Sequence, residues 1–164
     1  MKKPLKRSLP KRFYIGIDPG KTGGLVILPE RGDKKVVTQM PTTERDIWNW
    51  FADIPSPSFP FAVIEKVGSM PGNAARAMFT FGWGYGGLRM ALVARGIPFE
   101  EVTPQVWLKG LGIPFRKRKE SRTQFKNRLK GRAQQLFSDV DVTLATADAL
   151  LIATYCQRKA SGTL

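Results

Sequence analysis

The most informative run of this sequence is Phe13-Tyr14-Ile15-Gly16-Ile17-Asp18. An apolar run that ends in an acid is the pattern of a buried strand with a charged group at its end. Phe61-Ala62-Val63-Ile64-Glu65 repeats this pattern, and Asp148 interrupts the apolar face of a helix expected at 145–158. Because a buried carboxylate is costly without a positive partner, three acids from three separate elements predict a shared divalent cation.

Each acid, taken singly, also has a structural interpretation. Asp18 is able to cap the turn through Gly20, Glu65 to pair with Lys66 or an Arg, and Asp148 to form a private salt bridge. For Asp18 alone we favour the turn, since Asp-Pro-Gly is a common turn sequence. Taken together, the coincidence of three such acids favours a functional cluster.

The composition indicates one basic domain. The chain has 164 residues, 42% of them hydrophobic, and carries 27 Lys and Arg against 13 Asp and Glu, which gives a formal net charge of +14. This length suits a single domain, expected at 13–160 behind a basic flexible arm at 1–12. A charge excess of this size favours a polyanionic partner. No run reaches the ~18 apolar residues of a transmembrane helix, so we expect a soluble protein without a membrane partner.

The sequence contains no His. Ser-His-Asp triads, His-ligated zinc and imidazole general bases are therefore excluded, and carboxylate chemistry becomes the leading option. The lone Cys156 cannot form an internal disulfide, so we expect it to pack in the core of a protein from a reducing compartment. The basic N-terminus lacks the apolar run of a secretory signal. We expect a cytoplasmic or nucleoid-associated location, with a phage genome as one source.

The rest of the chain alternates strands and helices. Strands are expected at 13–18, 25–28, 36–40, 61–65 and 97–102, and helices from Thr42 or Thr43 and at 73–95, 104–107, 121–137 and 145–158. This order predicts an α/β fold with a sheet of about five strands and helices on its faces. Asp18 and Glu65 meet only if their strands are neighbours. Asp148 reaches the sheet on a helical stripe with Leu144, Leu151, Ile152 and Tyr155.

The helix expected at 73–95 combines glycines with aromatic residues. Its glycines are Gly82, Gly84, Gly86 and Gly87, and they weaken a helix unless another helix or a ligand backbone approaches closely. Its alternating aromatic residues are Phe79, Phe81, Trp83 and Tyr85. Rings at this spacing more often pack a core or a dimer interface, but the interleaved glycines would let one or two reach unstacked DNA bases.

The three acids suit a particular class of metal ion. Oxygen ligands without imidazole or thiolate favour Mg²⁺, with Mn²⁺ as a substitute. Two such ions stabilise both the attacking water and the leaving oxygen in phosphodiester hydrolysis. The sequence therefore predicts metal-dependent chemistry on a nucleic acid.

Several blocks of the sequence resemble one family. Residues 15–20, 63–65 and 147–153 are similar to the RuvC-like Holliday junction resolvases of the RNase H-like superfamily. Residues 65–72, 79–86 and 102–107 look like the phage-encoded and chloroplast-type branch. The resemblance spans residues 13–158, and the order and spacing of the blocks make it specific.

The resemblance implies an RNase H-like mixed sheet flanked by helices and a homodimer that resolves four-way DNA junctions by paired nicks. It implies Asp18, Glu65 and Asp148 as the catalytic metal ligands, with the helix at 79–88 against the junction centre. Family members have a further ligand shortly before the last acid, where this chain has Thr143, Leu144 and Ala145. Asp141 is the nearest substitute, with Asp139 behind it, although either acid is equally able to be a solvated turn residue.

The family also places a Lys near the scissile phosphate. Counting back from residues 132–137 favours Lys126, with Lys119 and Lys130 as close competitors. The other basic residues of this stretch are expected to line a phosphate rail: Arg116, Lys117, Arg118, Lys119 and Lys130. Two alternatives stay open. One is a nuclease with the same metals that cuts RNA–DNA hybrids or flap DNA, and the other is a catalytically silent nucleic-acid-binding protein.

Overall fold

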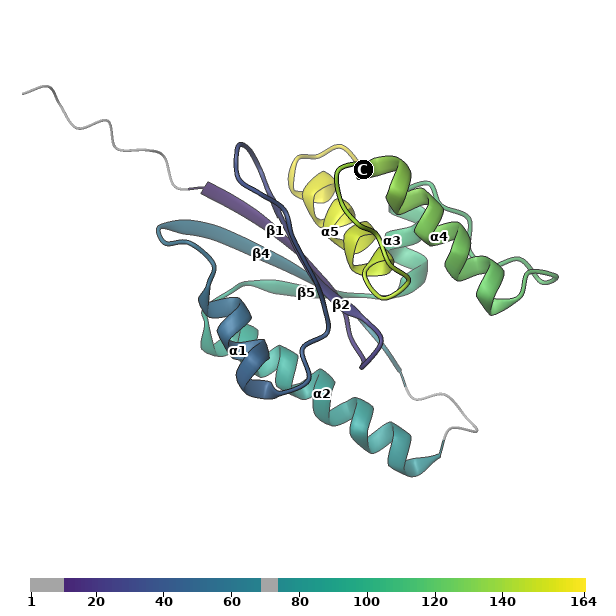
Figure 1. The fold of residues 1–164 in the computed structure, drawn as a ribbon, viewed down its shortest axis with the longest axis horizontal. Helices are drawn as coiled ribbons and strands as arrows, with labels where there is room; N and C mark the ends of the chain where they lie inside the picture. Colours follow the sequence, from purple (N-terminus) through teal and green to yellow (C-terminus); the bar gives the residue numbers. More distant parts are fainter. Residues whose placement is uncertain (1–10, 69–73) are drawn as a thin grey trace, which may run out of the picture.

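The computed structural model describes residues 11–68 and 74–164. The elements follow in the order β1 (Lys11–Asp18), β2 (Gly24–Pro29), β3 (Val36–Gln39), α1 (Glu44–Ala52), β4 (Ser58–Glu65), α2 (Ala75–Ala94), β5 (Phe99–Val102), α3 (Pro104–Gly110), α4 (Arg122–Leu136) and α5 (Ala147–Ala160) (Figure 1). This is the order predicted from the sequence. Of the arm expected at 1–12, Lys11 and Arg12 instead begin β1. Residues 1–10, and residues 69–72 of one family-like block, lie outside the described residues.

The five strands form one mixed sheet in the order β3-β2-β1-β4-β5. β1 pairs antiparallel with β2 and parallel with β4, which in turn pairs parallel with β5. Ile17 lies opposite Ile64 in the β1–β4 ladder, so the next residues of the two strands, Asp18 and Glu65, emerge at the same edge. The predicted sheet, and the predicted proximity of the two strands that end in acids, are both confirmed.

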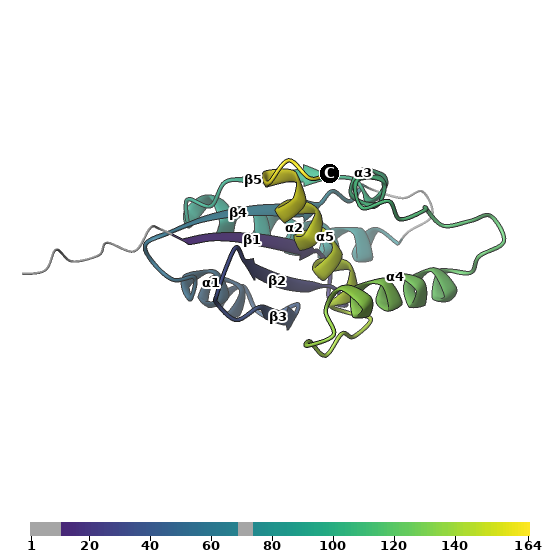
Figure 2. The ribbon, with the colours of Figure 1, turned by 90° about the horizontal axis from the view of Figure 1, so that it is seen from above.

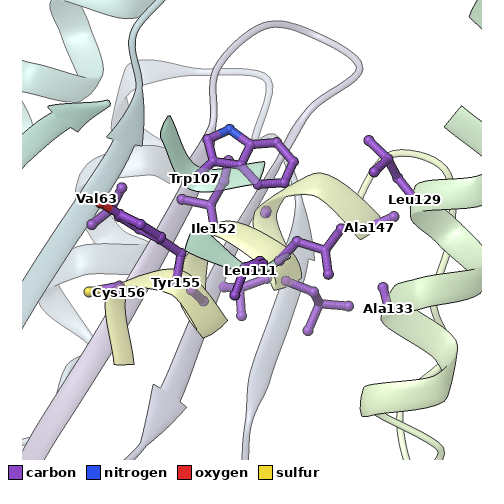
Figure 3. Close-up of a cluster of buried hydrophobic side chains, with 14 of the residues drawn as sticks. Val63, Trp107, Leu111, Leu129, Ala133, Ala147, Ile152, Tyr155 and Cys156 are labelled. Atoms are coloured by element: carbon purple, nitrogen blue, oxygen red, sulfur yellow. The ribbon is translucent and has the colours of Figure 1, made fainter. Parts of the chain in front are cut away.

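Helices cover both faces of this sheet (Figures 1 and 2). α3, α4 and α5 pack on one face, around a cluster that includes Trp107 and Ile152 (Figure 3). α1 and α2 pack on the other face, around Phe51 and Leu88. The strands separate these two cores because successive side chains of a strand point to opposite faces. None of the described helices is long and apolar enough to cross a bilayer.

α5 lies directly on the backbone of β1. A Cβ atom at Gly16 would lie 2.2 Å from the carbonyl oxygen of Ala149 and 2.3 Å from the amide nitrogen of Ala153, so no side chain fits there. The residues of α5 from its start to Cys156 are buried. Cys156 is therefore a core residue, as predicted, and burial raises the pKa of its thiol to about 12.

Two boundaries differ from the prediction for physical reasons. β4 begins earlier than expected and includes Pro60, which has no N–H to donate. The amide of Ala62 points toward β5, and strand alternation directs the nitrogen of Pro60 to the same side. Because β5 starts only opposite Ala62, no described strand lies beside Pro60 there, and the missing N–H costs no ladder hydrogen bond. α5 begins at Ala147, so Leu144 precedes the helix and is exposed rather than part of the buried stripe.

Candidate active site

Asp18 and Glu65 occupy equivalent positions at the ends of two parallel strands. Gly16, two residues before Asp18, packs on α5, and Val63, two residues before Glu65, belongs to the core on the α5 side. Strand alternation therefore turns both acids toward the face that α5 covers. Asp18 is buried and Glu65 is half-buried. The structure thus brings the first two predicted acids together.

Asp148 enters the same region from the first turn of α5. Thr143 and Thr146 exchange hydrogen bonds that build the turn leading into this helix. Asp148 is 4% exposed, and within the described residues its Oδ1 has no hydrogen-bond partner. A buried carboxylate oxygen without a partner is costly, which fits a binding position for a cation.

Lys126 supplies a positive charge to this cluster. Its Nζ donates a hydrogen bond to Oδ2 of Asp148. A capping box between Ser121 and Gln124 fixes the start of α4 and so the direction in which this lysine projects. Burial disfavours the charged form of Lys126, but the charge and hydrogen bond of Asp148, together with the charges of Asp18 and Glu65, outweigh burial and raise the pKa of the ammonium group. The lysine is therefore charged where it meets the acid.

The cluster carries more negative than positive charge. Burial raises the pKa of Asp18 well above its ordinary value, and the carboxylates of Asp148 and Glu65 raise it further, whereas Lys126 acts in the opposite direction. Burial also raises the pKa of Glu65. One ammonium group cannot neutralise three carboxylates, so the cluster favours the uptake of protons or of further cations.

The donor set of the cluster fits a hard divalent cation, because every available ligand is a carboxylate oxygen. Within residues 11–68 and 74–164, however, no three acidic, His or Cys side chains lie at the mutual spacing of a metal site. Two effects disfavour a closer approach of the acids. The ammonium group of Lys126 holds the carboxylate of Asp148, and the negative groups repel one another.

Trp107 also reaches the cluster, although the sequence assigned it no role. Its indole Nε1 donates a hydrogen bond to Oε2 of Glu65 over 2.8 Å. The available signal was the position of Trp107 in the family-like block at 102–107. The contact itself depends on β5 lying beside β4 with α3 following directly, and the sequence does not show that arrangement.

The candidate fourth metal ligand lies elsewhere. Asp141 is exposed in the segment before α5, and it is not among the charges that act on Asp18. Asp139 is exposed as well and forms an ion pair with Lys35 over 2.5 Å. The structure therefore places neither acid with the three carboxylates of the cluster.

Four residues of the predicted phosphate rail are exposed in the loop between α3 and α4: Arg116, Lys117, Arg118 and Lys119. The fifth, Lys130, is half-buried on α4. Arg128 fastens this loop to α4. Its guanidinium group donates to the carboxylate of Glu120 over 2.8 and 3.0 Å and to the carbonyl oxygen of Pro114 over 3.0 Å. The hydrogen bond from Arg128 lowers the pKa of Glu120 to about 2. Of the three candidate catalytic lysines, Lys126 forms the ion pair with Asp148, whereas Lys119 lies in this loop and Lys130 further along α4.

The four predicted aromatic contacts on α2 divide into two pairs. Phe81 and Tyr85 stack with ring centroids 6.4 Å apart, and the Phe81 ring lies 3.3 Å from the Cβ position of Gly20, in the turn that follows β1. Phe79 and Trp83 pack on each other with centroids 6.1 Å apart but remain largely exposed. The first pair therefore lies beside the turn that follows Asp18, while the second is exposed on the surface of α2.

The glycines of α2 face open space. A Cβ atom at Gly82, Gly84 or Gly86 would meet nothing within 4 Å, and one at Gly87 would meet only a side-chain carbon of Glu44 at 3.9 Å. The close approach predicted for these glycines therefore does not occur within the described part of this chain.

Comparison with solved structures identifies the fold. A Thermus thermophilus RuvC in complex with a Holliday junction substrate matches with a TM-score of 0.60 and 14% identity, over 92% of this chain and 97% of that chain. A second structure of Thermus thermophilus RuvC matches with a TM-score of 0.58 and 18% identity over the same shares. The yeast mitochondrial Holliday junction resolvase has a TM-score of 0.49 and 16% identity, over 96% and 82% of the two chains. No family model and no curated protein sequence matches. The fold is the RNase H-like fold of RuvC, as predicted.

Proposed function

We propose that this chain is a metal-dependent crossover junction endodeoxyribonuclease, which resolves four-way DNA junctions by paired nicks. The observation that carries the proposal is the convergence of Asp18, Glu65, Asp148 and Lys126 at the carboxyl edge of the β1–β4 pair. The fold supports it, since one solved protein with this fold is bound to a Holliday junction substrate. The formal charge of +14 supports a polyanionic substrate.

The three acids of the cluster are the proposed metal ligands, for two Mg²⁺ ions or for Mn²⁺ in their place. When bound, such ions supply Lewis-acid activation of the phosphodiester and of water. Oδ1 of Asp148, buried and without a hydrogen-bond partner among the described residues, offers the first ligand position. The register of β1 and β4 holds Asp18 and Glu65 side by side, so their positions do not depend on a loop.

Lys126 has a separate role in this proposal. Its ammonium group exchanges the carboxylate of Asp148 for a non-bridging oxygen of the scissile phosphate. A fixed positive charge at that oxygen offsets the negative charge that develops there during hydrolysis. The exposed loop at 116–119, held to α4 by Arg128, binds the neighbouring backbone phosphates.

Paired nicking requires two sites, and α2 offers a surface for a two-fold homodimer. Its exposed stripe follows a spacing of four, three, four and three residues: Phe79, Trp83, Gly86, Met90 and Val93. This is the spacing of a seam between two packed helices. The four apolar side chains are 70%, 64%, 65% and 62% exposed, and Gly86 leaves room for close approach by a second copy.

The test compares three labelled substrates in Mg²⁺: a four-way junction, a linear duplex of the same sequence and an RNA–DNA hybrid. We expect symmetric nicks in the junction alone. Preferential cutting of the hybrid, or of a flap in a fourth arm of the experiment, would assign the chain to a different nuclease activity. Junction binding without cleavage of any substrate would identify a silent binding protein. Asp148→Asn, measured in parallel, controls for contaminating nucleases.

A further inference from the structure

We propose that Trp107 is a positioning residue for Glu65, and that its indole N–H reserves one carboxylate oxygen so that the other is presented to the cation site. The inference rests on the proposed metal-dependent function, and it assigns a role to a residue outside the acid and lysine set. It starts from the hydrogen bond of 2.8 Å between Nε1 of Trp107 and Oε2 of Glu65.

The indole is held firmly in place. Trp107 is 1% exposed and belongs to the core formed by α3, α4 and α5, where Figure 3 shows it together with Ile152 and Leu111. Pro104 starts α3 directly after β5, and β5 pairs with β4 up to Glu65 itself, opposite Val102. A short, rigid connection therefore links the indole to the strand that carries the acid.

The chemistry of the indole N–H explains why it would direct the carboxylate. It is a donor without charge, it cannot lose its proton at ordinary pH, and it cannot act as a metal ligand. It therefore fixes Oε2 in every state of the site and leaves Oε1, which accepts no side-chain hydrogen bond from the described residues, for the cluster. The donor also favours the ionised form of Glu65 and so opposes the effect of burial.

A comparison with Asp148 sharpens this role. Asp148 accepts its hydrogen bond from Lys126, a charged and half-buried group that is able to leave for a phosphate. Glu65 accepts its hydrogen bond from a fully buried ring that the surrounding core holds in place. The carboxylate of Asp148 is thus able to reorient when a cation binds, while the carboxylate of Glu65 keeps one orientation.

The alternative is that Glu65 merely satisfies a buried N–H. In that case removal of the donor affects stability but not the affinity for metal. The matched control is Trp50, whose Nε1 donates to Oγ1 of Thr38 over 3.1 Å in a partly buried position at β3. Trp107→Phe and Trp50→Phe each delete one indole donor, but only the first donor touches an acid of the cluster.

The experiment measures Mn²⁺ binding in the absence of DNA, by titration calorimetry and by the rise in melting temperature with metal. Loss of a partner that orients a metal ligand typically weakens metal affinity about 10–100-fold. We expect Trp107→Phe to weaken Mn²⁺ binding within that range and Trp50→Phe to leave it unchanged. The metal concentration for half-maximal cleavage should rise by the same factor, with a smaller change in the rate at saturating metal.

Equal Mn²⁺ affinity in Trp107→Phe and the unaltered chain would overturn the inference. If Trp107→Phe does not fold, incorporation of benzothienylalanine at position 107 replaces the N–H by sulfur at nearly constant shape and serves as the same test. An unaltered chain that binds Mn²⁺ with the expected dependence on Trp107 but cleaves no junction would overturn the proposed function alone. An unaltered chain that binds no Mn²⁺ would overturn the role of Trp107 as well.

Discussion

α5 and α2 pack on opposite faces of the same sheet and use small residues in opposite ways. On the α5 side, Gly16 allows a helix to contact the backbone of β1, and a Cβ atom there would lie 2.2 Å from a carbonyl oxygen. On the α2 side, Gly82, Gly84 and Gly86 face open space. The α5 helix is buried against the sheet and carries Asp148 of the acidic cluster, whereas α2 displays apolar side chains that remain more than 60% exposed. A glycine in the sequence therefore indicates close packing only where another element of the fold lies against it, as α5 does at Gly16.

The largest expected effect tests this difference directly. Gly16→Ala should prevent folding or cost about 3 kcal/mol or more, because the clash involves backbone atoms that cannot move aside. Gly84→Ala should stabilise the chain by roughly 0.5–1 kcal/mol through helix propensity. Thermal and denaturant unfolding of both variants measures the contrast. A stable Gly16→Ala would show that α5 does not pack on β1 in this way.

The second prediction separates folding from activity on the α5 face. Asp18→Asn, Glu65→Gln and Asp148→Asn should each reduce cleavage by a factor on the order of 10³ or more, since each removes a proposed metal ligand. Junction affinity should change little, because the basic surface is intact. Nicking and gel-shift assays on the same preparations test both statements. Retained cleavage in one variant would remove that acid from the site.

The third prediction concerns lysines on α4. Lys126→Ala should lower the single-turnover rate on the order of 10²-fold with little loss of affinity, because it removes a positioned charge. Lys130→Ala and Lys119→Ala are the matched controls, and Arg116→Ala should weaken binding and its salt dependence instead. A rate loss in Lys130→Ala, with none in Lys126→Ala, would assign the catalytic role to Lys130 instead of Lys126.

The fourth prediction turns to the α2 face. Met90→Lys places a charge on the exposed stripe and should convert a dimer into a monomer, with loss of paired nicking. Gly84→Ala lies off the stripe and should leave the oligomeric state unchanged. Sedimentation velocity at micromolar protein, with and without junction DNA, gives the readout. A parent chain that remains monomeric on the junction would defeat the dimer proposal.

The smallest expected effect is a pH dependence on the α5 face. Burial raises the pKa of Asp18 in the folded chain, so the folded state binds more protons than the unfolded state between the two pKa values. In the absence of divalent metal, stability should therefore fall as pH rises from about 4, the unfolded value, through the raised pKa. Asp18→Asn should remove most of this slope. Chemical denaturation in a chelator at several pH values measures it, and a slope of opposite sign would contradict the assignment.

The convergence of Asp18 and Glu65 follows from two simple conditions. The two strands must be neighbours in the sheet, and strand alternation must then turn both acids toward the same face. The sequence predicts the choice of Lys126 less securely. Three lysines compete along 119–130, and the rotation of α4 relative to α5 is a tertiary property that selects among them.

Other features lay beyond sequence reasoning. The Thr143–Thr146 turn delays the start of α5, which explains why Leu144 leaves the buried stripe. Asp141 lies upstream of that turn and outside the cluster. The contact between Trp107 and Glu65 joins residues 42 positions apart through the pairing of β4 with β5. No local pattern reports a contact of that kind.

The distribution of charge implies an order of assembly. The chain as a whole carries a formal net charge of +14, but its proposed reaction centre is a small acidic cluster in which three carboxylates outnumber one ammonium group. If the chain binds DNA as proposed, a backbone drawn to the basic loop would be repelled over the last few ångströms until cations enter the cluster. Under the function proposed above, metal loading would therefore come before productive docking, and the three acids would keep a DNA-bound chain without metal from cutting.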